Sequence, residues 1–268
     1  MLLPLQGRNI AYDLIGKTTA PVVCMTHSLA SDGGMWAEQV PALLSHGYRV
    51  LRIDMRGHGG SDPVDGPYTM EQLAGDVALV LDALAIPKVH FIGLSIGGML
   101  GQAFAIGHGQ RLLSAMWCDT MPQSAADAKQ VWGERIKAVR DAGSLETLAD
   151  VTVERWLTDA VKKRDPGRYR QIRDTVAGTS VAGYTGCGAA IMDYDFVPRL
   201  PELKLPVLTV CGADDAGTPP GANRRIAELV PGGRYEQIAS ARHFPNVEHP
   251  HTFNAIMLHW LDSQAGIH

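Results

Sequence analysis

Residues 89–98 read Val89-His90-Phe91-Ile92-Gly93-Leu94-Ser95-Ile96-Gly97-Gly98, an apolar run that leads into a Gly-x-Ser-x-Gly pattern. The apolar run predicts a short buried strand, and the small residues after Ser95 predict the start of a helix. A serine in such a sharp strand-to-helix turn projects its hydroxyl group, and glycines on either side remove Cβ atoms that would collide there. We therefore expect Ser95 to be a nucleophile and the amide of Ile96 to form half of an oxyanion hole.

Composition limits the kinds of partner that the chain can have. It has 268 residues, of which 46% are hydrophobic and 19% charged, and its formal net charge is −4. This mild negative charge gives no electrostatic footprint for nucleic acid or an anionic membrane, so we expect neither as a partner. The chain lacks a signal-peptide pattern and any apolar run near the roughly 18 residues of a membrane span, so we expect a cytoplasmic protein.

Cysteines and histidines give no indication of a metal site. The four cysteines, at positions 24, 118, 187 and 211, form no close pair and no metal-ligand spacing. Cys24 and Cys211 lie in apolar, strand-like runs, where a thiol behaves as a small hydrophobic group. Because the histidines and acidic residues also lack zinc-ligand spacing, we expect free buried thiols, no metal and no cofactor.

Strands and helices alternate along most of the chain. Apolar runs predict strands at 21–26, 49–54, 89–92, 112–118 and 205–211, and helical spacing predicts helices at 36–44, 70–84 and 95–107. Between these two halves the pattern is helical, at 131–142, 145–157 and 166–177. We expect an α/β fold with a mostly parallel sheet, formed by residues 1–120 and 199–268, and a helical cap formed by residues 121–198. A separate helical domain is the alternative.

A nucleophilic serine needs a base, and the base needs an acid that orients it. His243 is the base that we expect, because it alone of ten histidines follows the last predicted strand at a suitable place. Asp215, in the loop after the strand at 205–211, is the acid that we expect, with Asp214 and Asp119 as alternatives. These aspartates could instead cap turns and helices. Parallel strands would bring the order Ser, Asp, His to one edge of the sheet.

The loop after the first apolar strand is placed to complete the oxyanion hole. It reads Thr26-His27-Ser28-Leu29-Ala30, and Leu29 is the residue that we expect to supply the second backbone amide. Ser28 could donate its hydroxyl group to the substrate or could simply be a turn residue. We expect His27 to anchor the loop.

With these residues in place, the chain resembles the α/β-hydrolase superfamily and, within it, the 3-oxoadipate enol-lactonase group. The matching motifs are spread over most of the chain: Arg49-Val50-Leu51-Arg52-Ile53-Asp54, Gly93-Leu94-Ser95-Ile96-Gly97, Val131-Trp132-Gly133-Glu134-Arg135-Ile136, Glu154-Arg155-Trp156-Leu157 and Asn246-Val247-Glu248. The resemblance implies the α/β-hydrolase fold, a helical cap, and hydrolysis of a small lactone that bears a carboxylate.

The resemblance also implies roles for residues of the cap. Arg135 is the candidate partner of a substrate carboxylate, and Trp132 and Trp156 would form apolar walls; a solvated arginine and two core tryptophans are the alternative. The chain departs from the family at Ile96, where a methionine is usual, and at Phe244, where smaller residues are usual. We expect Phe244 to border the substrate, so these differences leave the substrate open.

The expected activity is therefore cofactor-independent hydrolysis of a small-molecule ester or lactone by Ser95, Asp215 and His243. A general carboxylesterase and a hydrolase of another lactone would use the same three residues. A carbon–carbon bond hydrolase, a perhydrolase or a ligand receptor on a hydrolase fold are further alternatives. The sequence does not indicate an oligomeric state.

Overall fold

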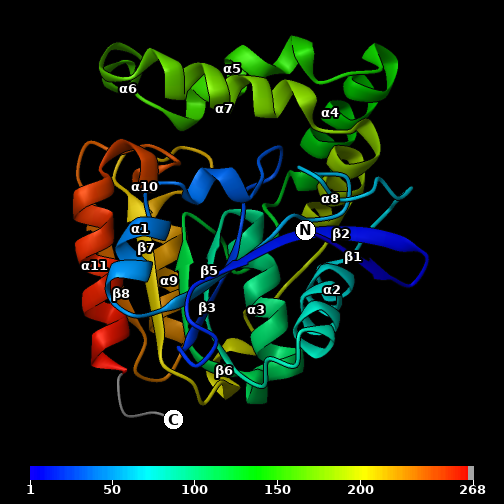
Figure 1. Ribbon diagram of the computed structural model, residues 1–268. Coiled ribbons are helices and arrows are strands. Elements are labelled where there is room, and N and C mark those ends of the chain that lie inside the picture. The colour runs from blue at the N-terminus through cyan, green and yellow to red at the C-terminus, as the bar shows by residue number, and fades with distance from the viewer. Residues whose placement is uncertain (265–268) are drawn as a thin grey trace.

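The computed structural model describes residues 1–264 and shows a central sheet with helices on both faces (Figure 1). The strands follow the order β1-β2-β4-β3-β5-β6-β7-β8 across the sheet. The β1–β2 and β2–β4 pairs are antiparallel, and every pair from β4 to β8 is parallel. The strands are β1 (Leu2–Leu5), β2 (Arg8–Ile15), β3 (Val22–Thr26), β4 (Arg49–Ile53), β5 (Val89–Leu94), β6 (Leu112–Cys118), β7 (Val207–Gly212) and β8 (Arg234–Ile238).

The central strands are apolar because both faces of the sheet are covered. Every residue of β3, β5, β6 and β7 is buried, and strands buried on both faces read as continuous apolar runs. The five strands predicted from such runs are confirmed as β3 to β7, each with small differences at its ends. The predicted fold class is therefore correct.

Within residues 1–264, six α-helices lie outside the central insertion. They are α1 (Val40–Ser45), α2 (Met70–Ala83), α3 (Ile96–His108), α9 (Pro220–Leu229), α10 (Pro245–Glu248) and α11 (Pro250–Ser263), with short 3-10 turns at η1 (Gly33–Trp36), η2 (Gly109–Arg111) and η3 (Leu200–Glu202). The start of α2 is fixed by a capping box between Thr69 and Gln72. The helix predicted at 36–44 is confirmed only from Val40: Trp36 ends η1, and α1 begins at Val40, where Pro41 favours a first helical turn.

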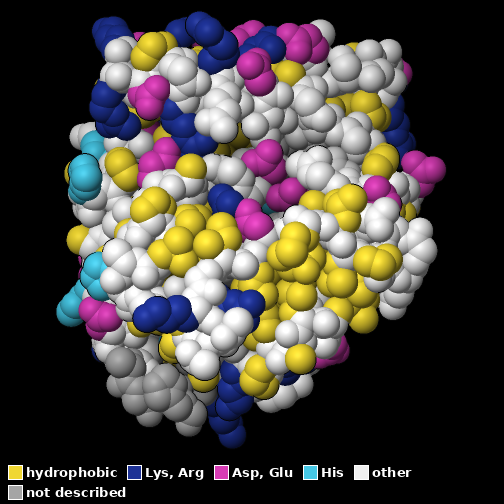
Figure 2. Space-filling model, in the orientation of Figure 1, with side chains coloured by type: hydrophobic (Ala, Val, Ile, Leu, Met, Phe, Trp, Pro, Cys, Tyr) yellow, Lys and Arg dark blue, Asp and Glu magenta, His cyan; other side chains and the backbone are white. Residues whose placement is uncertain are grey.

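A helical insertion separates β6 from β7. It consists of α4 (Ala128–Ala142), α5 (Glu146–Trp156), α6 (Asp159–Arg164), α7 (Pro166–Gly178) and α8 (Val181–Met192). Figure 1 shows α5, α6 and α7 as a layer above one end of the sheet, and α5 packs along α7 as α4 packs along α8. Figure 2 shows many charged side chains on the outer surface of this upper layer. The helices predicted at 131–142, 145–157 and 166–177 are confirmed as α4, α5 and α7.

The four cysteines are free and buried, as the sequence predicts. Within residues 1–264, no helix combines the length and the apolar character that crossing a membrane requires.

Candidate active site

Ser95 occupies a strained turn between β5 and α3. Its backbone has a φ of 60° and a ψ of −122°, which is uncommon for a residue with a side chain and persists only where the surroundings enforce it. The Ser95 N–H donates to the carbonyl of Cys118 on β6 at 2.9 Å, and the Thr120 hydroxyl group donates to the Ser95 carbonyl at 2.8 Å. The residue is buried, with 8% of its surface exposed.

Two glycines make this turn possible. A Cβ atom at Gly93 would lie 2.2 Å from the carbonyl oxygen of Gly97, and one at Gly97 would lie 2.5 Å from that of Thr26. Both obstacles are backbone atoms, so no rotation of a side chain could relieve them. The Gly-x-Ser-x-Gly pattern is therefore a steric requirement of this strand–turn–helix junction.

Asp215 and His243 form a buried pair at the edge of the sheet where Ser95 also lies, because β5, β7 and β8 run parallel and these residues follow their carboxyl ends. His243 Nδ1 lies 2.8 Å from Asp215 Oδ2, and the two residues are 5% and 3% exposed, respectively. Asp214, the alternative acid one position earlier, is exposed. Asp215 therefore holds the imidazole in one orientation, with Nδ1–H as the donor.

Three further hydrogen bonds orient the Asp215 carboxylate. Its Oδ1 accepts the N–H groups of Gly217, at 2.8 Å, and of Thr218, at 3.2 Å, and its Oδ2 accepts the Thr218 hydroxyl group. Burial alone would raise the pKa of Asp215, but the charge of His243 and these hydrogen bonds together lower the pKa to about 2. The carboxylate is therefore ionised at neutral pH.

Asp119, at the end of β6, completes a three-residue group with this pair. A carboxylate oxygen of Asp119, a carboxylate oxygen of Asp215 and an imidazole nitrogen of His243 lie within 4.8 Å of one another, a spacing that metal ligands can have. However, hydrogen bonds from His243, Thr218 and Gly217 occupy all four lone-pair positions of the Asp215 carboxylate. The residues present therefore do not fit a metal ion.

The loop after β3 lies against the Ser95 turn. The Thr26 hydroxyl group donates to the carbonyl of Gly97 at 3.1 Å, which joins the end of β3 to the start of α3. The buried His27 ring anchors the loop: its Nδ1 lies 2.8 Å from the Ser28 carbonyl, and its Nε2 accepts the Met55 N–H at 2.9 Å. Burial also lowers the pKa of His27, so the ring is a neutral anchor.

Leu29 and Ser28 lie in this anchored loop. Leu29 follows the segment that contacts the start of α3, and Ile96 is the first residue of α3, so its N–H has no partner within the helix. The Ser28 hydroxyl oxygen is buried and has no hydrogen-bond partner within residues 1–264. The three groups belong to the two segments that the Thr26–Gly97 hydrogen bond joins.

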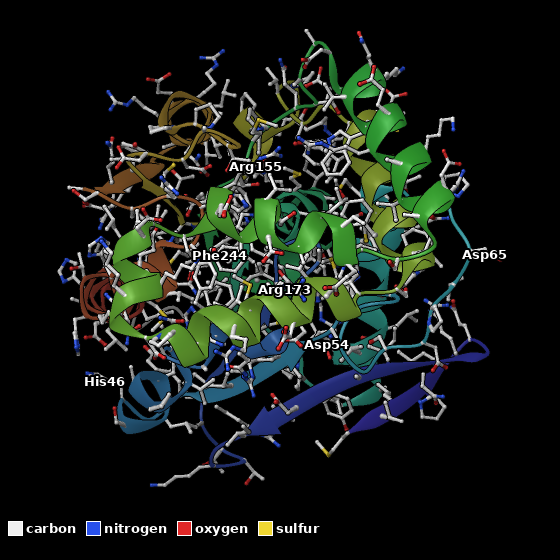
Figure 3. The ribbon with its side chains drawn as sticks, turned by 90° about the horizontal axis from the view of Figure 1, so that it is seen from above. His46, Asp54, Asp65, Arg155, Arg173 and Phe244 are labelled. Carbon is white, nitrogen blue, oxygen red and sulfur yellow. The ribbon has the colours of Figure 1, made fainter. Side chains whose placement is uncertain are left out.

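An aromatic stack connects the helical insertion to the buried pair. The Trp156 ring on α5 stacks on Phe244 at 4.4 Å between centroids and 15° between planes, and it lies 6.2 Å from the His243 ring. The Phe244 N–H also donates to the Trp156 carbonyl at 3.2 Å. In Figure 3, viewed from above, Phe244 lies beneath α5 and α7. Trp156 and Phe244 thus form an apolar wall next to His243.

The other residues predicted for the cap form a second cluster. The Arg135 guanidinium lies over the Trp132 ring at 5.0 Å, and Trp132 lies 6.1 Å from the Tyr184 ring on α8. Arg155 on α5, labelled in Figure 3, also acts on Tyr184. Burial raises the pKa of the Tyr184 phenol, and the positive charges of Arg135 and Arg155 both oppose that rise. Within residues 1–264, no carboxylate lies within 4.0 Å of either guanidinium.

Sequence reasoning did not identify three residues that organise the site. Thr218 orients Asp215, and the Asp-x-x-Thr spacing of a side-chain-capped turn could have indicated it. Glu248 is buried, and its carboxylate accepts the Thr158 N–H at 2.9 Å, the Thr158 hydroxyl group at 2.6 Å and the Arg242 N–H at 2.5 Å. Arg242 in turn donates to the carbonyl of Leu157 at 3.0 Å. No local pattern indicates these ties between the insertion and the His243 segment.

Comparisons with known proteins agree with this geometry. A family model described as the alpha/beta hydrolase fold matches residues 21–250. The chain is 32% identical over 252 residues to 3-oxoadipate enol-lactonase 2 of Acinetobacter baylyi, covering 94% of this chain and 92% of that protein. The enol-lactonase structure from Burkholderia xenovorans matches with a TM-score of 0.93 at 35% identity, covering 98% of this chain and 100% of that one.

A thermophilic esterase from Thermogutta terrifontis, solved with malate bound, matches with a TM-score of 0.90 at 26% identity and covers 98% of this chain and 97% of that one. The resemblance seen in the sequence motifs is thereby confirmed. The relatives hydrolyse esters and lactones, and the present chain shares their fold over nearly its full length. The chain therefore belongs to the α/β-hydrolase family and is a carboxylic ester hydrolase of the lactonase or esterase type.

Proposed function

We propose that this protein hydrolyses a small lactone that bears a carboxylate, of the 3-oxoadipate enol-lactone kind, through an acyl-enzyme formed on Ser95. The proposal rests on the buried Asp215–His243 pair and the strained Ser95 turn, which lie at the same edge of the sheet because β5, β7 and β8 run parallel. A serine, a histidine and an ionised aspartate in this arrangement supply a nucleophile, a base and an orienting charge without a cofactor.

The proposed reaction has two halves. Ser95 attacks the lactone carbonyl while His243 takes the serine proton, and Asp215 stabilises the imidazolium that forms. The amides of Leu29 and Ile96 hold the oxyanion, and His243 then returns the proton to the leaving ring oxygen. Water attacks the acyl-enzyme in the same way, and residues 121–198 act as the cap that shields these steps.

The charge of the insertion supports a carboxylate on the substrate. Arg135 and Arg155 lie near the same phenol ring and have no carboxylate partner within residues 1–264, so their guanidinium groups are available to an anion. Trp132, Trp156 and Phe244 would contact the apolar part of the substrate, and Ser28 would donate a hydrogen bond to it. The enol-lactonase relatives and the malate-bound esterase point to the same chemistry.

The nucleophile is tested by covalent labelling. Ser95→Ala is expected to abolish labelling by a serine-directed alkyl phosphonate and to abolish hydrolysis of every lactone and ester. Ser28→Ala is the control for labelling only: it removes another buried hydroxyl group, which we propose to bind substrate, so this variant should still be labelled at Ser95 even if its hydrolysis is slower. Labelling of the Ser95→Ala protein at the wild-type rate would overturn the mechanism.

The substrate class is tested with charge-neutral arginine variants. For 3-oxoadipate enol-lactone, Arg135→Gln or Arg155→Gln is expected to raise KM by about 10-fold or more, the size of a lost charge-assisted hydrogen bond. For an uncharged aryl acetate the same variants should leave KM within about twofold of the wild type. Arg140→Gln, an exposed residue on α4, is the control. Equal effects on both substrates would favour a general carboxylesterase.

A further inference from the structure

A second carboxyl group lies buried beside the Asp215–His243 pair. Asp119 directly follows β6, the strand that pairs with β7, and its side chain is fully buried. Its Oδ1 accepts the N–H of Gly212 at 2.9 Å, and its own N–H donates to the carbonyl of Val210 at 2.9 Å. Its φ of 42° lies in the left-handed region. Asp119 is thus held in a fixed position by the neighbouring strand.

The two oxygens of the Asp119 carboxyl group have different surroundings. Oδ2 is buried and has no hydrogen-bond partner within residues 1–264. Burying a carboxylate without hydrogen bonds costs free energy. A carboxylate oxygen of Asp215 and an imidazole nitrogen of His243 lie within 4.8 Å of an Asp119 oxygen. Burial, and then the charge of Asp215, raises the pKa of Asp119 well above its usual value. Of the two carboxyl groups, Asp119 is therefore the one that favours the proton, and Asp215 the one that favours the charge.

The other titratable groups that face Asp119 do not compete for this role. They are the thiols of Cys118 on β6 and Cys211 on β7 and the phenol of Tyr235 on β8. Burial raises the pKa of all three groups, so they stay neutral at neutral pH. Asp215 is therefore the charged neighbour that adds to the effect of burial on Asp119.

We propose that Asp119 is a second positioning carboxyl group for His243, held in reserve behind Asp215. When the charge at position 215 is removed, the repulsion that adds to burial in raising the pKa of Asp119 disappears, so the pKa of Asp119 falls. Asp119 then ionises and stabilises the imidazolium from the end of the neighbouring strand. This inference rests on the proposed role of His243 as the catalytic base.

A double-mutant cycle tests the proposal. Asp215→Ala is used because an amide at position 215 would stabilise the wrong tautomer of the imidazole. Loss of the triad acid costs about 10,000-fold in kcat where no substitute exists, so Asp215→Ala is expected to lose clearly less, about 100- to 1,000-fold. Asp119→Asn is then expected to lower kcat at least about tenfold more in the Asp215→Ala protein than in the wild type. Equal effects in the two backgrounds would overturn the proposal.

Two readouts separate this role from a purely structural one. The kcat of Asp215→Ala should rise with pH as Asp119 ionises, and the Asp119→Asn/Asp215→Ala protein should lack that rise. In solution NMR, a downfield Nδ1 proton of His243 should be present in Asp215→Ala and absent from the double variant. Because the NMR signal needs no turnover, its presence would support Asp119 even if the hydrolase mechanism failed, and its absence would refute it.

The controls keep the test decisive. Asp214→Asn removes an exposed carboxylate from the same loop and should leave the cycle unchanged. If the alanine variant does not fold, judged by its urea unfolding curve, Asp215→Ser provides the same comparison with a smaller cavity. A serine background in which Asp119→Asn has no additional effect on kcat would count equally against the proposal.

Discussion

Gly97→Ala adds one methyl group where two backbone carbonyl groups already lie. The new Cβ atom would be 2.5 Å from the Thr26 oxygen and 2.8 Å from the His27 oxygen. Gly107→Ala is the matched control, because Gly107 belongs to the same helix, is exposed, and has no atom within 4 Å of an added Cβ. The two substitutions share their chemistry and differ in the space available.

The magnitudes follow from these distances. An ordinary contact begins at 3.4 Å, so the separation of Cβ from the Thr26 oxygen must grow by 3.4 − 2.5 Å, or about 0.9 Å. Overpacking of this kind costs about 1–3 kcal/mol, whereas replacing glycine by alanine in an unobstructed helix gains up to about 1 kcal/mol. We expect Gly97→Ala to destabilise the protein by about 1–2 kcal/mol and Gly107→Ala to be neutral or mildly stabilising.

Activity should be more sensitive than stability. The displaced segment carries Ser95 and the amide of Ile96, and a misplacement of about 1 Å costs on the order of 100-fold in rate. Urea unfolding gives the free energies, and ester hydrolysis gives kcat for both variants. A Gly97→Ala protein with the stability and kcat of Gly107→Ala would refute the steric account of the turn.

Two further predictions concern buried carboxylates. The pKa of Asp215 falls from its usual 3.8 to about 2 on folding. At about 1.36 kcal/mol per pH unit, this shift contributes about 2.4 kcal/mol to the free energy of unfolding. The contribution is present above pH 4 and is lost as the pH falls through 2. Urea unfolding should therefore show the gap between wild type and Asp215→Asn shrinking by about 1.6 kcal/mol from pH 5.5 to 2.5, and a constant gap would contradict this. Glu248→Gln should lower the free energy of unfolding by about 2 kcal/mol at pH 7, because an amide turns a donor toward Thr158 or Arg242; an unchanged urea midpoint would contradict this.

The sequence predicts the elements whose surroundings are uniform. Strands β3, β5, β6 and β7 are buried on both faces and appear as apolar runs. Strands β1 and β8 lie at the edges of the sheet, mix exposed with partly buried positions, and leave no such signal. The edge strands therefore became visible only with the structure.

The site divides in the same way. The Ser95 turn is a local device, so its glycines reveal it directly. Asp119 and Asp215 both follow neighbouring parallel strands, and chain order alone leaves both as partners of His243. Only the turn at Thr218 and the direction of the Asp215 side chain distinguish them. Contacts such as that between Thr158 and Glu248 join residues 90 apart and have no local pattern.

The hydrogen bonds between the insertion and the segment around His243 also determine when the site can form during translation. Thr158 is translated 90 residues before Glu248, which is about 5–18 s at ordinary rates of synthesis. During that interval the Thr158 amide lacks its Glu248 partner and the Trp156 carbonyl lacks its Phe244 partner, although the residues of the Ser95 turn have all been made. His243 and the Glu248 carboxylate that ties down the insertion are made together, after the insertion itself. A nascent polypeptide therefore has the complete site only after Glu248 has been added.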